Sequence, residues 1–209
     1  MGYTVIKMPS FERLPKAVST HIDMLMFYDG EKIITHREYY EKNKSIFNSL
    51  NIETLTTDEY ISNEYPNDIL FNAVLTKDGF LFSKTNKTSK LIKDRAKVLV
   101  NVRQGYTSCS TCRVSDKAFI TTDRGLYDAY IKNDIDSLFV ESEGIFLPGY
   151  NCGFIGGASV TIEEFVCFFG DIRERKDYRK IRSFVEKYGK KVLSLSNEKL
   201  TDIGGGIVV

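Results

Sequence analysis

Tryptophan is absent from this 209-residue chain, and histidine is nearly absent, since His21 and His36 are the only two. This scarcity excludes a metal centre built from several histidines. Four cysteines in a chain of this length are too few for a disulfide scaffold, which favours a reduced, intracellular setting. The sequence also lacks an 18-residue apolar run and an apolar signal-peptide core, so we expect a cytoplasmic protein without a membrane span.

An excess of charge of either sign is also lacking. The chain has 29 Lys and Arg against 28 Asp and Glu, which gives a net charge of +1. A nucleic-acid wrapper or a polybasic membrane binder would need a strong basic excess, so both kinds of partner are excluded. Hydrophobic residues make up 42% and charged residues 27%, as in an ordinary soluble globular protein. We expect a single domain over residues 1–209.

A repeat is present instead. Its first copy has an apolar run at 23–28, an Asp-Gly turn, a second run at 32–36, a helical stretch at 37–50 and a strand at 52–55. Three further copies follow the same order of hairpin, helix and strand, with first strands predicted at residues 69–76, 111–114 and 152–160. One equivalent position in the four hairpins is occupied by Ile33, Leu81, Ile120 and Cys167. These residues are 48, 39 and 47 positions apart.

The two ends of the chain suggest how the repeat closes. Four units cover residues 22–196, and strand-like patterns also occur at Tyr3–Met8 and Ile203–Val209. Two ends that each look like part of a unit predict a closed ring with a fifth, composite unit, because closure removes exposed sheet edges. The predicted fold class is therefore an α/β protein, a five-unit β/α propeller whose fifth unit is closed by the N- and C-terminal strands. An open α+β sandwich is the alternative.

The order of several motifs resembles the guanidine-modifying, or pentein, superfamily of five-unit β/α propellers. Tyr65–Phe71 (YPNDILF) is similar to its Pro-Asn-Asp guanidine-binding motif, and Phe168–Asp171 to its Phe-x-Gly-His motif. Leu200–Gly206 resembles the glycine-rich strand that leads to the catalytic Cys. Four further segments resemble an uncharacterised bacterial branch of the fold: QGYTSC at 104–109, LPGY at 147–150, GFIGGA at 153–158 and LTDIG at 200–204.

Two departures from the superfamily pattern matter for function. Asp171 stands where the enzymes have a His, and no Cys follows the glycines in Gly206-Ile207-Val208-Val209. The resemblance implies that this Cys attacks the guanidinium carbon while the His moves protons, so that mechanism does not carry over. Two hypotheses stay open: a protein that binds or modifies a small guanidino or amino compound, as a deiminase- or amidinotransferase-like enzyme with a non-standard site, or a non-catalytic binding or sensor protein.

A propeller brings the start of each unit's first strand toward one mouth of the ring. The polar residues at these places are His21, Asp23, Asn67, Asp68, Asn72, Cys109, Cys112, Asn151, Cys152 and Asp202. Carboxylates and amides in a concave site suit a small cation such as a guanidinium. The predicted substrate-binding residues are therefore Asn67, Asp68, Asn72, Asn151 and Asp202, although Asx residues often bond only to nearby backbone.

The candidate catalytic residues are Cys109, Cys152, His21 and Asp171. The two cysteines lie in glycine-containing loops and could replace the missing nucleophile. His21 could form an acid/base dyad with Asp23, or could be a surface-loop histidine. Asp171 could equally cap a helix.

Two short motifs are not assigned to chemistry. Cys109 and Cys112 form a CxxC motif. Its role stays open between redox exchange, zinc binding and a pair of inert thiols, and we predict no bound metal. The glycine-rich Gly153–Gly157 fits no phosphate-binding loop, so no cofactor is predicted. We expect this segment to be a strand that passes close to another backbone or a ligand.

Overall fold

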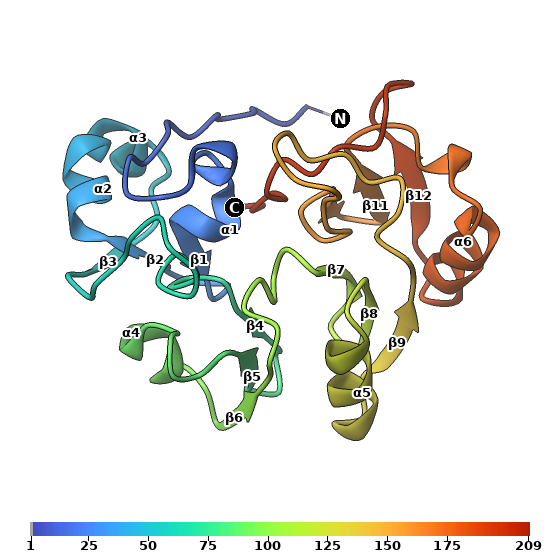
Figure 1. The fold of residues 1–209 in the computed structure, drawn as a ribbon, viewed down its shortest axis with the longest axis horizontal. Helices are drawn as coiled ribbons and strands as arrows, with labels where there is room; N and C mark the ends of the chain where they lie inside the picture. Colours follow the sequence, from blue (N-terminus) through green and yellow to red (C-terminus); the bar gives the residue numbers. More distant parts are fainter. Residues whose placement is uncertain (1) are drawn as a thin grey trace.

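The computed structural model describes residues 2–209 and has four three-stranded sheets arranged around a common centre (Figure 1). In each sheet an antiparallel hairpin is followed by a helical segment and by a third strand, which pairs in parallel with the hairpin's second strand. The predicted order of hairpin, helix and strand is thus confirmed for four units. The four anchor residues of the sequence repeat all lie in the middle strand of their sheets.

The elements of the first two units have the following bounds. Before the first sheet come η1 (Lys16–Val18) and α1 (Ile22–Leu25). Unit one contains β1 (Met26–Tyr28), β2 (Ile33–His36), α2 (Arg37–Lys42), α3 (Lys44–Ser49) and β3 (Thr54–Thr57). Unit two contains β4 (Val74–Leu75), β5 (Phe80–Ser83), α4 (Lys90–Lys93) and β6 (Val98–Asn101).

The last two units have longer helices. Unit three contains β7 (Thr111–Ser115), β8 (Ala118–Thr121), α5 (Arg124–Lys132) and β9 (Asp136–Phe139). Unit four contains β10 (Ser159–Ile162), β11 (Phe165–Phe168), η2 (Ile172–Glu174), α6 (Tyr178–Lys187) and β12 (Lys191–Ser194). In α6 the apolar residues Ile181 and Val185 recur at helical spacing and are fully buried against the fourth sheet's core.

The first strand of three units is shorter than the sequence predicts. Residues 23–25 belong to α1, residues 69–73 form turns before β4, and residues 152–158 are loop and turn before β10. The reason is that polar side chains and glycines here make contacts between units rather than continue a ladder. For example, Asn72 bonds to backbone of unit one and of the loop before β7.

The predicted strands at Tyr3–Met8 and Ile203–Val209 do not form. The N-terminal segment crosses between units one and four with exposed side chains; that of Val5 is 82% exposed (Figure 1). The C-terminal segment is held in an irregular path because Gly204 and Gly205 both have positive φ. A fifth unit with paired terminal strands is therefore wrong. A single parallel bridge, Phe146 to Thr201, is the pairing that the segment after β12 makes.

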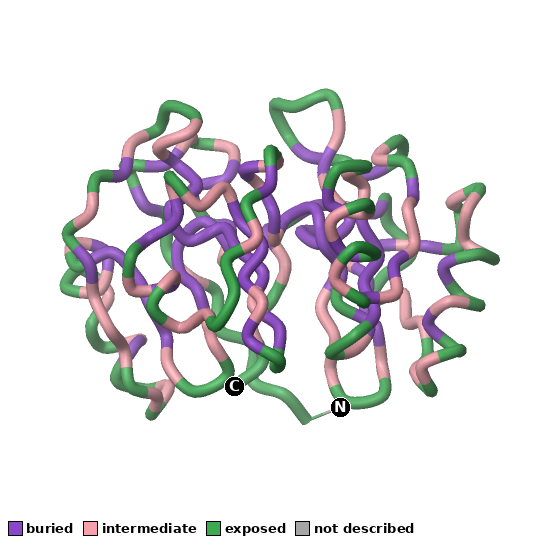
Figure 2. The backbone as a smooth tube through the Cα atoms, turned by 90° about the horizontal axis from the view of Figure 1, so that it is seen from below, coloured by how far each residue is buried: buried purple, intermediate pink, exposed green. Residues whose placement is uncertain are grey.

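Buried residues concentrate around the middle of the molecule, and both ends of the chain lie on the same side of it (Figure 2). The loops that join one unit to the next run toward this buried centre. They carry most of the polar residues that the sequence singles out.

Candidate functional site

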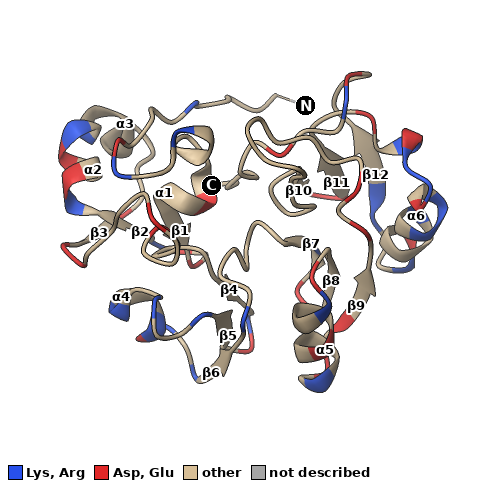
Figure 3. Ribbon diagram, in the orientation of Figure 1, with Lys and Arg blue, Asp and Glu red and all other residues tan. Residues whose placement is uncertain are grey.

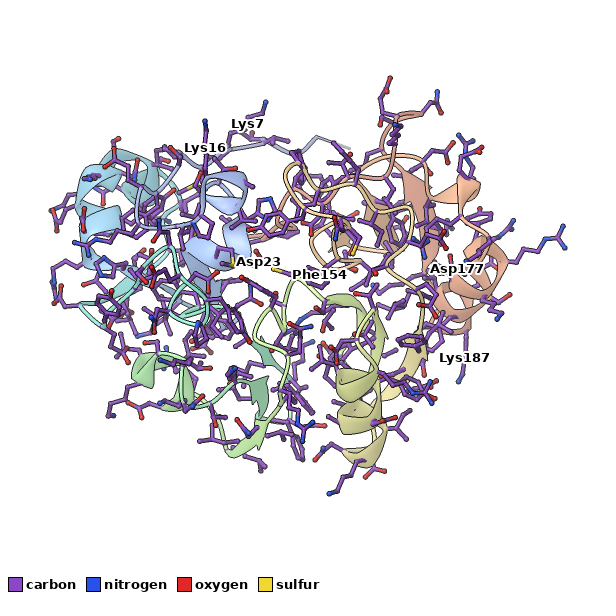
Figure 4. The ribbon with its side chains drawn as sticks, viewed as in Figure 1. Lys7, Lys16, Asp23, Phe154, Asp177 and Lys187 are labelled. Atoms are coloured by element: carbon purple, nitrogen blue, oxygen red, sulfur yellow. The ribbon has the colours of Figure 1, made fainter. Side chains whose placement is uncertain are left out.

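Polar side chains from four separate segments meet at the centre of the ring. These side chains, each less than 10% exposed, are His21, Asp23, Asn72, Cys109 and Asp202, and are called the axial cluster below. Asp23 lies near the middle of the ring in Figure 4, as does Phe154, whose backbone N–H contacts the cluster. His21 and Asp202, which are 181 residues apart in the sequence, are thus brought to one place.

Asn72 links the cluster to two units. Its Nδ2 donates to the Cys109 Sγ at 3.0 Å and to the Asp23 carbonyl at 3.2 Å. Its Oδ1 accepts from the backbone N–H of Ser108 at 2.7 Å. Because these bonds fix the side-chain amide, Asn72 orients the thiol of Cys109 beside the Asp23 carboxyl group.

Asp202 is held by backbone. Its Oδ2 accepts from Phe154 N at 2.8 Å, and its Oδ1 accepts from Gly204 N at 3.0 Å. A Cβ at Gly157 would lie 1.9 Å from Oδ1, so only glycine leaves room for this carboxylate. Burial raises the pKa of Asp202, and the two backbone bonds partly offset the rise.

His21 faces Asp202 rather than Asp23, with 3.7 Å between Nδ1 and Oδ1. This separation is too long for a hydrogen bond. Burial lowers the pKa of His21 to about 4, so the imidazole is neutral at pH 7 and the pair is not a salt bridge. The surface-loop alternative for His21 is wrong, since the side chain is 4% exposed.

Asp23 is the most perturbed carboxyl group. Burial, together with the nearby charge of Asp202, raises its pKa to about 8, while contact with the Cys109 thiol partly opposes the rise. Its Oδ1 is buried and accepts no hydrogen bond among the described residues. An unbonded buried carboxylate oxygen is costly, and it is what a cationic ligand would satisfy.

A cavity of about 370 Å³ reaches Asp23 from the hairpin end of the ring. Its walls are the first strand of each unit and, as a fifth side, residues 204–208. Of the axial cluster only Asp23 lines the cavity; the other members lie behind it. The cavity therefore does not open where the sequence predicts, at the loops between units. In those loops Tyr106 and Phe154 lie near each other, with ring centroids 6.0 Å apart, and neither lines the cavity.

Asp68 lies beside the axial cluster, not in it. Its Oδ2 accepts from Tyr106 OH at 2.7 Å, and its Oδ1 is buried without a hydrogen-bond partner among the described residues. Burial raises the pKa of Asp68, and the bond from Tyr106 lowers it in part. The raised pKa of Tyr106, caused by burial and by Asp68, keeps the phenol protonated as the donor.

The other predicted site residues are held elsewhere. Asn67 accepts from Lys87 Nζ at 2.9 Å, and Asn151 is exposed. Cys152 is half-buried and donates to Ser142 Oγ at 3.4 Å. Asp171 accepts from the backbone N–H of Arg173 and pairs with its guanidinium at 2.7 Å, which lowers its pKa to about 2.

Helix capping accounts for three polar residues that precede helices. Asp171 caps η2, His36 accepts from Glu38 N at the start of α2, and Asp123 accepts from Leu126 N at the start of α5. All four cysteines are free. Burial raises the pKa of Cys112 to about 12, so this half of the CxxC is an unreactive thiol at neutral pH.

The glycine-rich segment at 153–157 is a turn rather than the predicted strand, but the predicted close approach is present. A Cβ at Gly156 would lie 2.3 Å from the Ser108 carbonyl oxygen. Sequence reasoning did not single out Tyr106 or Phe154 as site residues. The signal was their place inside the QGYTSC and GFIGGA segments.

The described residues, 2–209, contain no group of three or more His, Cys, Asp or Glu that could hold a metal ion. Within the same range no helix is long and apolar enough to cross a membrane.

Comparison with solved structures defines the fold. The chain resembles an agmatine deiminase from C. jejuni, with a TM-score of 0.52 and 11% identity. The match covers 81% of this chain and 63% of the enzyme, which is less than two thirds of the enzyme's length. The chain also resembles DDAH from Pseudomonas aeruginosa (0.51, 10% identity, covering 90% and 72%) and an amidinotransferase from Microseira wollei (0.52, 9%, covering 90% and 68%). The chain therefore has the fold of the pentein superfamily.

The particular family within this fold comes from the sequence. The model of a family of unknown function, DUF6873, matches residues 1–207, and the chain belongs to this family. No sequence among the curated proteins matches it.

Proposed function

We propose that this protein binds a small cationic guanidino or amino compound in the axial cavity, with the Asp23 carboxylate as the group that receives the cation. The observation that carries the proposal is Asp23 Oδ1, which is buried and without a hydrogen bond at the inner end of a cavity. A guanidinium or ammonium N–H would supply the missing donor and the opposite charge.

The pKa of Asp23 makes this binding conditional on pH. With a pKa of about 8, most of the carboxyl group is protonated at pH 7 when the cavity is empty. A cation stabilises the ionised form, so binding releases a proton. The neighbouring Asp202 adds negative potential at the same place.

The solved neighbours support a ligand of this chemistry. One is DDAH in complex with citrulline, and another is an agmatine deiminase. In this chain Asp68, within the segment that resembles the guanidine-binding motif, lies next to the axial cluster through Tyr106. Asp68, Asn72 and Asp202 are proposed to shape the site from behind Asp23, whereas Asn67 and Asn151 do not line the cavity.

The state of Cys109 favours binding without covalent chemistry. Burial and the nearby Asp23 and Asp202 raise the pKa of the Cys109 thiol well above its ordinary value. No imidazole contacts the thiol, because His21 faces Asp202. An unactivated thiol is a poor nucleophile. The non-catalytic binding or sensor role is therefore the version we propose, and Cys109 as a nucleophile is the alternative that the experiment tests.

Isothermal titration calorimetry with arginine, agmatine and methylarginines tests the proposal. We expect at least one compound to bind, the affinity to rise by up to about ten-fold per pH unit between pH 6 and 8, and Asp23→Asn to abolish binding. Asp128→Asn, which removes an exposed carboxylate on α5, is the control. Equal binding by Asp23→Asn, or no binding by any compound, would refute the assignment. If the protein forms a ureido product and Cys109→Ala abolishes that product, the role of the protein is catalytic and the binding-only role is wrong.

The arrangement of the units suggests a role for the C-terminal segment. Four first strands and residues 204–208 form the five sides of the cavity. We propose that the C-terminal segment takes the place of a fifth unit's inner strand, without a sheet of its own, and that residues 1–209 act as one domain.

A further inference from the structure

Basic residues are concentrated in unit two. Between residues 77 and 103 there are eight Lys and Arg and only two Asp, a net charge of +6 in a chain whose total is +1. Figure 3 shows this as blue over α4 and the segments that flank β5 and β6. A local excess of this size on a nearly neutral protein marks a place where anions are attracted.

Most basic side chains elsewhere in the structure are neutralised. Within residues 2–209, fifteen ion pairs join a Lys or Arg to an Asp or Glu, and twelve of them use a Lys or Arg outside unit two. On α6 and the turn before it, Arg173, Arg175 and Arg182 each hold a carboxylate at 2.6–2.7 Å. Unit two differs, because only three of its eight cations, Lys77, Lys90 and Arg95, pair with a carboxylate. The other five have no carboxylate within ion-pair distance among the described residues, and they are Lys84, Lys87, Lys93, Lys97 and Arg103.

Three of these cations are nevertheless held in place by neutral acceptors. Lys84 Nζ donates to Tyr65 OH at 3.1 Å and lies 4.9 Å from the centre of that ring. Lys87 Nζ donates to Asn67 Oδ1 at 2.9 Å, and Lys93 Nζ donates to the Thr85 carbonyl at 3.3 Å. A neutral acceptor positions an ammonium group without cancelling its charge, and leaves its other donors free.

A surface pocket lies among these groups. It is lined by Lys84, Thr85, Asn86, Asn101, Val102 and Arg103, without any carboxylate. Asn101 Oδ1 accepts from the Thr85 N–H at 3.1 Å and from its hydroxyl at 2.9 Å. The amide nitrogen of Asn101 is thereby left as a donor beside two cations. The carboxylates at the two ends of α4 are engaged elsewhere: Glu59 accepts from Lys90 N at the start of the helix, and Asp94 at its end pairs with Lys90 Nζ.

We propose that this pocket binds a phosphate group, with Lys84 and Arg103 as the cationic contacts and Asn101 as a neutral donor. Arginine and lysine with amide donors around an open pocket are the groups that recognise phosphate oxygens. Lys87 and Lys93 add a long-range attraction from beside the pocket. The phosphate is that of a free inorganic anion or of a nucleotide, and this site is independent of the axial cavity.

Titration calorimetry with inorganic phosphate, pyrophosphate and a nucleoside triphosphate tests the site. We expect pyrophosphate to bind, and the double change Lys84→Ala with Arg103→Ala to weaken it by at least about ten-fold. The matched control is Lys132→Ala with Lys199→Ala, which removes the same charge from exposed positions outside the pocket and should alter the affinity less than about two-fold. Equal affinity for pyrophosphate and the triphosphate indicates recognition of phosphate alone, whereas tighter triphosphate binding indicates a nucleotide.

Three results would overturn the proposal. They are no binding of any of the three anions at about 10 mM, equal loss of binding in the site and control variants, and binding to duplex DNA without binding to pyrophosphate. The substituted side chains lie at the surface, and matching thermal unfolding curves would show that both double variants are folded.

Discussion

The buried centre of the ring and the surface of unit two both hold charge that no opposite charge balances, but they hold it in different surroundings. At the centre, burial raises the pKa of Asp23 to about 8, so its charge is present only when pH or a ligand favours it. The lysines of unit two face water, where a charge costs little and is screened by salt. Binding at the centre should therefore respond to pH, and binding at unit two to salt.

The largest expected effect is at Asp23. Because its folded pKa is raised above the unfolded value of 3.8, the folded state binds the proton more tightly, and stability falls as pH rises from about 4 through 8. Asp23→Asn removes this loss. We expect the variant to be more stable than the original chain at pH 9, on the order of 5 kcal/mol, and nearly equal to it at pH 4. Urea unfolding at the two pH values measures the difference.

Asp171→Asn is the matched control for that prediction. Its pKa is lowered to about 2 by Arg173, so its carboxylate stabilises the folded state above pH 4, and the variant should gain nothing at high pH. A gain at pH 9 by both variants would mean that general charge repulsion, rather than burial of Asp23, sets the trend.

A smaller effect is expected from crowding the centre. Gly157→Ala puts a methyl group where Asp202 Oδ1 lies, and should destabilise the protein by about 2 kcal/mol. At Gly189 a Cβ meets nothing within 4 Å, so Gly189→Ala should cost only the strain of its positive φ, about 1 kcal/mol. Chemical unfolding of both variants would show whether the centre is as tightly packed as the contacts indicate. Equal losses would contradict that packing.

The repeat was predictable from the sequence because hairpins leave a local signature. The turn at Asp29-Gly30 and the apolar strands beside it mark the first hairpin with no help from distant residues. The irregular starts of the first strands were not predictable. Residues 69–73 are apolar enough for a buried strand, and their turns arise because Asn72 bonds to the backbone of Ser108 and Asp23, which lie outside unit two.

The sequence was enough to predict which residues form the axial cluster, but not which of them face each other. Polar residues at unit starts pointed to the centre, and the structure brings together His21, Asn72, Cys109 and Asp202. That His21 faces Asp202 rather than the nearby Asp23 depends on the path of Gly204, which packs against His21 Cα.

His21 gives an opposite dependence on pH at the same centre. Its folded pKa of about 4 lies below the unfolded value of 6.5, so protonation favours the unfolded state and stability is lost as pH falls from 6.5 to 4. His21→Asn should remove this loss, and the variant should gain about 2 kcal/mol relative to the original chain between pH 7 and pH 4.5. Urea unfolding at these values measures it. A gain that is the same at both values would show that the imidazole does not titrate in this range.

The smallest effect on stability should come from unit two, where the comparison with the centre is sharpest. Lys84→Ala with Arg103→Ala should change the free energy of unfolding by less than about 0.5 kcal/mol, because solvated charges contribute little to folding. In the absence of ligand, we expect this double variant to be slightly more stable than the original chain at low salt, because fewer positive charges repel one another. This stability difference should vanish near 0.5 M salt, where the screening length is only about 4 Å. The stability difference between Asp23→Asn and the original chain at pH 9 should persist at that salt concentration, because Asp23 is buried and salt screens buried charges much less than exposed ones. If the two differences disappeared together as salt increased, the charge at Asp23 would be solvated, and the contrast between the two regions would be lost.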